Sequence, residues 1–340
     1  MSVWLITGGT GFIGANFVFF LLEKRPKDRI VILDKLTYAG NLSTLSPVLE
    51  KENVRFIRGD IADRETVEAV FEEEKPDILV NFAAESHVDR SIDDPAPFLQ
   101  TNLIGTGVPL DVCVQKGIRR FHQISTDEVY GEIQDAGTPS VDENAPLRPG
   151  NPYAASKAAA DLLILSYRRT YSLPVSISRC SNNFGRYQFP EKLIPRMVIR
   201  ALEGKTLPLF GNGEDIRDWI SVSDHCRAVF EIIEKGQEGE IYNIGGGNER
   251  SNRTVVEAIC RLTGCCEEKI VHTPDRKGHD RRYSLNAEKL RALGWVPEET
   301  FEETLAQTVT WYRENRSWWE PLLARDFWPE WAREALEAEK

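Results

Sequence analysis

Two adjacent carboxylates, Asp127 and Glu128, follow an apolar stretch and a threonine in the segment "ISTDEVYG" at residues 124–131. Neighbouring acids repel each other, so this adjacency needs a reason. Two interacting carboxyl groups tend to split their pKa values, which leaves one protonated while the other is ionised. Such a pair can remove a proton from one carbon and protonate a leaving hydroxyl on the next. The pattern therefore predicts a device for eliminating water, with Thr126 beside it.

A tyrosine and a lysine, Tyr153 and Lys157 in "PYAASKAAAD", are four residues apart and would lie on one face of a helix. A phenol has a pKa of about 10 and is a poor base at neutral pH. We expect a nearby ammonium group and a cationic nicotinamide ring to lower that pKa. The phenolate could then take a proton from a sugar hydroxyl while the adjacent carbon loses a hydride.

Three glycines, Gly8, Gly11 and Gly14 in "ITGGTGFIG", come directly after an apolar strand and open a helix. Small residues at this spacing make a tight turn, admit a pyrophosphate to the backbone and let helix and strand pack closely. Asp34 ends the next apolar stretch, where a carboxylate would hold the ribose 2′-hydroxyl and repel a 2′-phosphate. We therefore expect NAD rather than NADP. Weaker candidates at later strand ends are Asp60, Ile61, Ala83 and Ala84.

The first half of the chain must position these residues, and its apolar strands alternate with amphipathic helices. We expect strands at 3–9, 29–34, 54–60, 77–84, 119–126 and 173–179, and helices at 14–24, 64–75, about 95–115 and 152–171. This alternation is typical of a parallel sheet covered on both faces. The prediction is an α/β, Rossmann-type, doubly wound parallel sheet.

The second half differs in texture, because prolines and glycines become frequent after about Phe184. We expect a NAD-binding Rossmann domain at 1–184, with a return segment near 220–250, and a smaller, interleaved substrate-binding domain at 185–340. The stretch "GEIYNIGGG" could send a strand back to the first sheet.

Composition limits the partners. The 340 residues carry a formal net charge of −11, which disfavours nucleic acid and anionic lipid. The N-terminus lacks the features of a signal peptide, and the longest apolar stretch is too short to span a bilayer. No cysteine pair has the spacing of a metal site. We expect a cytoplasmic protein with free thiols, no metal, no nucleic-acid partner and no membrane contact.

Together, the glycine motif, the parallel sheet and the Tyr153–Lys157 pair resemble the extended short-chain dehydrogenase/reductase superfamily. The motifs "STDEVYG", "AAESHVDRS", "SNNFGRYQFPEKLIP", "RDWI" and "DRKGHDRRY" narrow this to the dTDP-glucose 4,6-dehydratase family. The resemblance implies C4 oxidation of dTDP-glucose, loss of water across C5 and C6, and hydride return to C6. It implies that Thr126 holds the sugar near O4, Asp127 is the acid, Glu128 the base, and Tyr153, helped by Lys157, starts the oxidation.

The same resemblance extends the site in two lists. Its cofactor residues are Gly8, Gly11, Phe12, Ile13, Gly14, Asp34, Lys35, Thr37, Asp60, Ile61, Ala83, Ala84, Thr101, Tyr153, Lys157 and Asn183. Its substrate residues are Ser86, Thr126, Asn182, Lys192, Leu193, Pro208, Phe210, Arg217, Asn252, Arg276, His279 and Arg282. The basic members would supply charge-assisted donors to a nucleoside diphosphate. Relatives usually dimerise, so we expect a homodimer.

Two alternatives remain open at this point. One is a relative that acts on another nucleotide sugar such as UDP-glucose, as a dehydratase or a C4-epimerase. An epimerase has no use for the Asp127–Glu128 pair. The other is a dinucleotide-binding sensor without catalysis, which would typically have lost Tyr153 or Lys157.

Overall fold

The structure is a computed structural model that describes residues 1–133, 138–274 and 280–323. Its centre is a sheet with the strand order β10-β6-β5-β4-β1-β2-β3, and every neighbouring pair is parallel. This is the doubly wound order of a Rossmann fold with one strand added at the β6 edge. The strands are β1 (Val3–Thr7), β2 (Arg29–Asp34), β3 (Val54–Arg58), β4 (Ile78–Asn81), β5 (Arg120–Thr126), β6 (Val175–Cys180) and β10 (Ile241–Ile244).

Helices cover both faces of this sheet, because the strands are apolar on both sides. Alternate residues of β1 illustrate this: Ile6 packs with α1 (Phe12–Lys24) and α8 (Val222–Lys235), whereas Leu5 faces the other core. That second core includes side chains of α2 (Arg64–Glu74), α5 (Gly105–Lys116) and α6 (Pro152–Tyr171). Burial on both faces explains why these strands read as continuous apolar runs.

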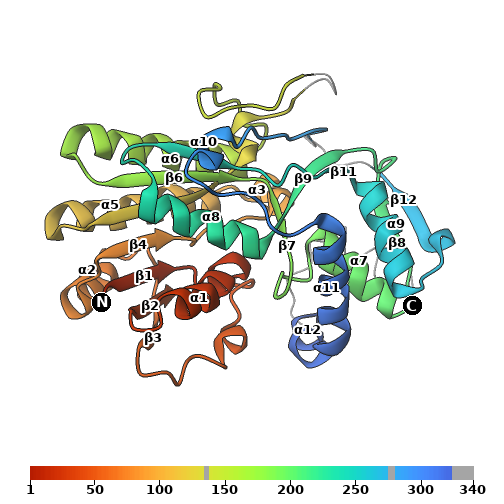
Figure 1. The fold of residues 1–340 in the computed structure, drawn as a ribbon, viewed down its shortest axis with the longest axis horizontal. Helices are drawn as coiled ribbons and strands as arrows, with labels where there is room; N and C mark the ends of the chain where they lie inside the picture. Colours follow the sequence, from red (N-terminus) through yellow and green to blue (C-terminus); the bar gives the residue numbers. More distant parts are fainter. Residues whose placement is uncertain (134–137, 275–279, 324–340) are drawn as a thin grey trace.

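A smaller region lies beside the carboxyl ends of the large sheet and has its own core (Figure 1). It contains a sheet in the order β11-β9-β7 and the pair β12-β8. Its strands are β7 (Asn182–Phe184), β8 (Leu207–Phe210), β9 (Ile216–Ser221), β11 (Glu249–Ser251) and β12 (Ile270–Thr273). Its main helices are α7 (Leu193–Leu202), α9 (Asn252–Thr263), α11 (Phe301–Glu314) and α12 (Arg316–Leu323).

The chain passes between the two regions more than once. After β9 it returns as α8, which packs against α1, and then as β10, which pairs with β6. The return strand expected from "GEIYNIGGG" is therefore present. The boundary between the two domains at residues 184 and 185 stays a prediction.

Several local expectations need correction. The single helix expected over about 95–115 is divided into α4 (Ala96–Phe98), a π-helical stretch η2 (Leu99–Ile104) and α5. A short helix α3 (Val88–Asp93) was not expected. The fourth strand ends at Asn81, so Ala83 and Ala84 lie in the loop after it rather than in the strand. The remaining short elements are η1 (Leu42–Leu45), η3 (Asp127–Tyr130), η4 (Glu267–Lys269) and α10 (Glu288–Arg291).

Within these described ranges, no helix combines the length and apolar character needed to cross a membrane.

Candidate active site

A first cavity lies at the carboxyl ends of β1, β2 and β4 and has a volume of about 90 Å³. Ten residues expected at a dinucleotide site line it: Gly8, Gly11, Asp34, Lys35, Thr37, Asp60, Ile61, Ala83, Ala84 and Thr101. Six other expected residues do not line this cavity: Phe12, Ile13, Gly14, Tyr153, Lys157 and Asn183. The sequence reasoning missed Leu33, Ala39, Gly40, Gly59, Phe82 and Glu85, which also line it.

The glycines are required by geometry. Gly8 has a φ of +65°, and a Cβ placed there would lie 2.5 Å from the backbone nitrogen of Ala83. A Cβ on Gly14 would lie 2.4 Å from the carbonyl oxygen of Gly8. The turn therefore exposes backbone at the N-terminus of α1, whose N-cap is Gly11 and where free N–H groups favour a phosphate. This cradle fits a dinucleotide.

The carboxylate of Asp34 is held at the edge of this cavity. Its Oδ2 accepts from the backbone N–H of Thr10 at 3.0 Å, and its Oδ1 accepts from that of Leu36 at 2.8 Å. Beside it, Lys35 donates to the Thr101 hydroxyl at 3.0 Å and pairs with Asp60 at 3.3 Å. The position suits a carboxylate that accepts from a ribose hydroxyl.

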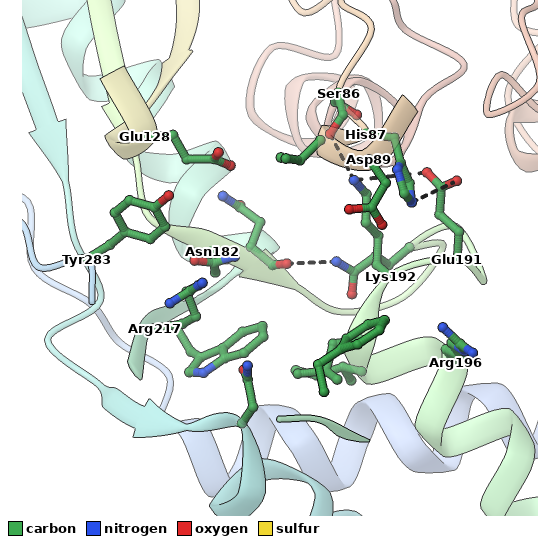
Figure 2. Close-up of a pocket in the computed structure, with 18 of the residues that line it drawn as sticks. Ser86, His87, Asp89, Glu128, Asn182, Glu191, Lys192, Arg196, Arg217 and Tyr283 are labelled. Atoms are coloured by element: carbon green, nitrogen blue, oxygen red, sulfur yellow. Dashed lines mark hydrogen bonds and ion pairs between the residues drawn. The ribbon is translucent and has the colours of Figure 1, made fainter. Parts of the chain in front are cut away.

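The second cavity, of about 210 Å³, lies between the large sheet and the smaller region (Figure 2). Among the expected residues, Ser86, Glu128, Asn182, Asn183, Lys192, Leu193, Pro208, Phe210, Arg217 and Asn252 line it. Residues that sequence reasoning missed are His87, Val88, Asp89, Asn151, Gln188, Glu191, Ile194, Arg196, Met197, Trp219, Asp280 and Tyr283. His87 and Glu191 are within the quoted motifs "AAESHVDRS" and "SNNFGRYQFPEKLIP", which was the available signal.

Two expected arginines differ in their placement. Arg217 lies against the ring of Tyr283, 4.8 Å from its centroid, and donates to the carbonyl oxygen of Asp280 at 2.7 Å. Arg282 does not line the cavity, because its guanidinium donates twice to the carboxylate of Glu249, at 2.8 and 3.0 Å. The two other expected substrate residues of this segment, Arg276 and His279, lie outside the described residues.

The acid pair opens the 3₁₀ helix η3 at the end of β5. The hydroxyl of Thr126 donates to Asp127 Oδ1 at 3.2 Å and accepts from the backbone N–H of Glu128 at 3.3 Å. Asn151, the N-cap of α6, donates to Glu128 Oε2 at 3.2 Å. The N-termini of η3 and α6 therefore lie together at the acid pair. The Glu128 carboxylate faces the second cavity (Figure 2).

The environments of the two acids differ. Burial, followed by the charge of Glu128, raises the pKa of Asp127 well above its usual value. Burial also raises the pKa of Glu128, but the Asn151 amide and the positive charges of Arg217 and Lys192 oppose this rise. Glu128 therefore has more groups that favour its ionised form, and Asp127 is the member suited to hold the shared proton.

The Tyr153–Lys157 pair is buried at the start of α6, and each side chain is less than 9% exposed. Burial and the nearby acids raise the pKa of Tyr153 well above its usual value, so the expected lowering is wrong for the protein alone. Lys157 donates to the carbonyl oxygen of Ile124 at 2.6 Å, and burial lowers its pKa to about 8. The Thr126 hydroxyl opposes the rise in the pKa of Tyr153 through a hydrogen bond.

Comparison with known proteins places this site in a family. The GDP-mannose 4,6 dehydratase family matches residues 5–308. A dTDP-glucose 4,6-dehydratase of Escherichia coli is 44% identical, with 94% of this chain and 96% of that protein covered. The chain belongs to the dTDP-glucose 4,6-dehydratase family.

Two solved dTDP-glucose 4,6-dehydratases have the same fold. The one from Bacillus anthracis, in complex with NAD, has a TM-score of 0.89 at 46% identity and covers 95% of this chain and 100% of its own. The one from Streptomyces venezuelae, with NAD bound, has a TM-score of 0.90 at 48% identity and covers 94% and 99%. The predicted family, fold class and NAD cofactor are confirmed. This dTDP-glucose 4,6-dehydratase family member is an NAD-dependent hydro-lyase, as predicted.

Proposed function

We propose that the protein converts dTDP-glucose to dTDP-4-keto-6-deoxyglucose and water, and that Thr126, Asp127, Glu128, Tyr153 and Lys157 carry the reaction. The observation that supports this most is the buried acid pair, whose members have different partners at one edge of the second cavity. Neighbouring carbons, C5 and C6, need an acid and a base that lie this close together. An epimerase would leave the pair without a role.

The cofactor residues of this proposal are the ten that line the first cavity, with the α1 N-terminus facing the pyrophosphate. Asp34 would accept from the adenosine ribose, and its charge would reject a 2′-phosphate. NAD, when bound, supplies the acceptor for the C4 hydride and later the donor to C6. The other expected cofactor residues lie elsewhere. Phe12, Ile13 and Gly14 form the first turn of α1, and Asn183 lines the second cavity.

Oxidation at C4 requires a base at the sugar's O4. The Tyr153 side chain accepts that proton as a phenolate, and Thr126 holds the same hydroxyl. Lys157 is four residues along the same helix, and its ammonium favours the phenolate form. Burial raises the pKa of Tyr153, and the Thr126 hydroxyl and the positive charge of the cofactor, when bound, would oppose this rise.

Elimination follows at the acid pair. The C4 ketone makes the C5 proton acidic, and the ionised Glu128 carboxylate removes it. The protonated Asp127 carboxyl gives its proton to the departing C6 hydroxyl, which leaves as water. Burial of Asp127 supports this order, because burial raises the pKa of this carboxyl and so favours its protonated form.

The diphosphate of the substrate would bind Lys192 and Arg217, which bring positive charge to the second cavity. The remaining lining residues from the sequence, Ser86, Asn182 and Asn252, offer neutral hydrogen-bonding groups there. Leu193, Pro208 and Phe210 would contact the apolar parts of the nucleotide. Arg276, His279 and Arg282 stay sequence predictions.

The proposal includes a cytoplasmic homodimer. Leu99 and Ile104 of η2 and Leu162 of α6 are each about half exposed, and α6 lies against η2 and α5. Apolar side chains on these sheet-flanking helices fit a contact with a second copy. All six cysteines are free thiols, as a reducing compartment would keep them. Leu162→Asp should yield monomers on gel filtration, whereas Leu262→Asp, on the exposed face of α9, should not.

Mass spectrometry of the protein incubated with dTDP-glucose, and in parallel with UDP-glucose, tests the reaction. Loss of one water from the dTDP sugar alone supports the proposal and the choice of base. Loss from both sugars would mean a less selective nucleotide pocket. If neither sugar changes mass after NAD has been added, the proposed reaction is wrong, and a test for the galactose epimer comes next.

A further inference from the structure

One side-chain hydrogen bond joins segments that line the two cavities. The hydroxyl of Tyr38 donates to Glu191 Oε1 at 3.0 Å. Tyr38 lies between Thr37 and Ala39, which both line the first cavity, whereas Glu191 lines the second. The two residues are 153 positions apart in the sequence, so only the tertiary structure brings them together.

The ring of Tyr38 is packed as well as hydrogen-bonded. Phe189 lies edge-on to it with the ring centroids 5.6 Å apart, and the guanidinium of Arg90 lies 3.8 Å from its centroid. Leu322 of α12 belongs to the same small core. Removing the hydroxyl alone would therefore leave the packing of this loop in place.

Glu191 is 7% exposed and gathers groups from three segments. Besides the Tyr38 hydroxyl, His87 Nε2 lies 3.7 Å from its Oε2, and Lys192 Nζ lies 3.9 Å from its Oε1. Lys192 also donates to the carbonyl oxygen of Ser86 at 3.0 Å, as Figure 2 shows. The residue next to Glu191 is thus the one proposed to hold the diphosphate.

We propose that Tyr38 and Glu191 are positioning residues that couple the two cavities, so that a nucleotide diphosphate bound at Lys192 slows release of the dinucleotide. This inference rests on the proposed function, which places those ligands. A ligand that binds Lys192 fixes the segment that carries Phe189 and Glu191. That segment in turn holds Tyr38, whose loop forms one wall of the dinucleotide cavity.

Such coupling suits the reaction. The hydride removed from C4 must return to C6 of the same molecule, so the reduced cofactor has to stay bound until the sugar has lost water. Coupling between two sites is reciprocal, so the dinucleotide should also slow release of the nucleotide. Typical coupling between sites changes an affinity by about fivefold or more.

The test measures dissociation of NADH from the full-length protein. The protein is loaded with NADH and chased with excess NAD, and the fall in bound-NADH fluorescence is followed with and without dTDP. We expect dTDP to slow this release by about fivefold or more in the wild type. In Tyr38→Phe the slowing should fall below about twofold, because the hydroxyl that connects the loops is absent.

Two further variants sharpen the result. Glu191→Gln keeps an acceptor but loses its charge, and it should also reduce the slowing by dTDP. Tyr167→Phe is the matched control. The Tyr167 hydroxyl likewise donates to a carboxylate, but it joins α6 to Asp111 of α5 and not the two cavities. This variant should behave like the wild type.

Equal slowing by dTDP in the wild type and in Tyr38→Phe would overturn the coupling while leaving the proposed function intact. Absence of any slowing in the wild type, with both ligands bound, would also overturn it. A wild-type protein that binds neither NADH nor dTDP would overturn the proposed function and this inference together.

Discussion

Replacing Asp127 by asparagine should separate the oxidation step from the loss of water. The side chain is 4% exposed, and burial raises its pKa well above the usual value, which favours the protonated carboxyl. The amide therefore changes neither the charge nor the volume of the buried group. Its oxygen can still accept from the Thr126 hydroxyl, which now lies 3.2 Å from Oδ1. We expect the free energy of unfolding to change by no more than about 1 kcal/mol, the size of one neutral hydrogen bond.

The catalytic effect should be much larger than the effect on stability. A positioned general acid contributes about 10²- to 10⁴-fold to a rate, which is about 3–5 kcal/mol of barrier. An amide cannot supply that proton to the C6 hydroxyl. Tyr153 and Lys157 are unchanged in this variant, so oxidation at C4 should proceed. Reduced nicotinamide should accumulate while water loss slows by about 10²- to 10⁴-fold.

A single-turnover experiment follows both steps. Near-ultraviolet absorbance reports the reduced nicotinamide, and mass spectrometry of quenched samples reports the dehydrated sugar. Asp89→Asn is the matched control, because Asp89 also lines the second cavity but lies across it from Glu128 (Figure 2). That variant should accumulate no reduced cofactor. Dehydration at the wild-type rate in folded Asp127→Asn would refute the acid role.

Four further predictions follow from the same structure. Tyr153→Phe should slow the first hydride transfer by about 10²-fold or more, and reduction of bound NAD at the normal rate would remove the base role. Asp34→Ala should weaken NAD binding by about tenfold and relax the rejection of NADP, and an unchanged preference would mean that another residue holds the ribose. Asp161→Asn should lower the free energy of unfolding in urea by about 3–5 kcal/mol. The reason is that the buried Arg179, whose Nε lies 2.9 Å from Asp161 Oδ2, would lose its counter-charge. A loss of less than about 1 kcal/mol would show that Asp161 and Arg179 do not form a buried ion pair in solution. Burial lowers the pKa of His122 and His225 to about 3 in the folded protein. As the pH falls below the ordinary histidine pKa, these side chains are therefore protonated in the unfolded chain but not in the folded one. Stability should therefore be intact at neutral pH and drop by about 1.4 kcal/mol per histidine at about pH 5.5, and His225→Leu should remove about half of that drop. An identical drop in His225→Leu would contradict this account.

Local patterns predict a dinucleotide site at the turn after the first strand. The spacing of Gly8, Gly11 and Gly14 and the aspartate at the end of the second strand are features of a short segment of chain. Apolar strands that alternate with helices predict a parallel sheet, and such a sheet brings its strand ends to one edge. Asp60, expected at a strand end, and Thr101, expected from the family resemblance, both line the first cavity, although Thr101 lies in η2 rather than at the end of a strand.

The sequence predicts substrate binding for both Arg217 and Arg282 and does not show how differently the fold would place them. Arg217 and Arg282 look alike there, because both stand in polar, loop-like stretches. In the structure one faces the second cavity, and the other donates twice to Glu249. The difference depends on a carboxylate 33 residues away in the chain, and no local periodicity records such a partner.

The sequence by itself determined which chemical groups this protein has and which of them are neighbours in the chain: the acid pair, the tyrosine and lysine on one helix face, and the glycine turn. Only the tertiary structure decided their protonation and their connections. Burial raises the pKa of both Asp127 and Tyr153, the second against expectation, because desolvation depends on everything packed around a group. The Tyr38–Glu191 contact likewise joins segments that have no relation until the chain has folded.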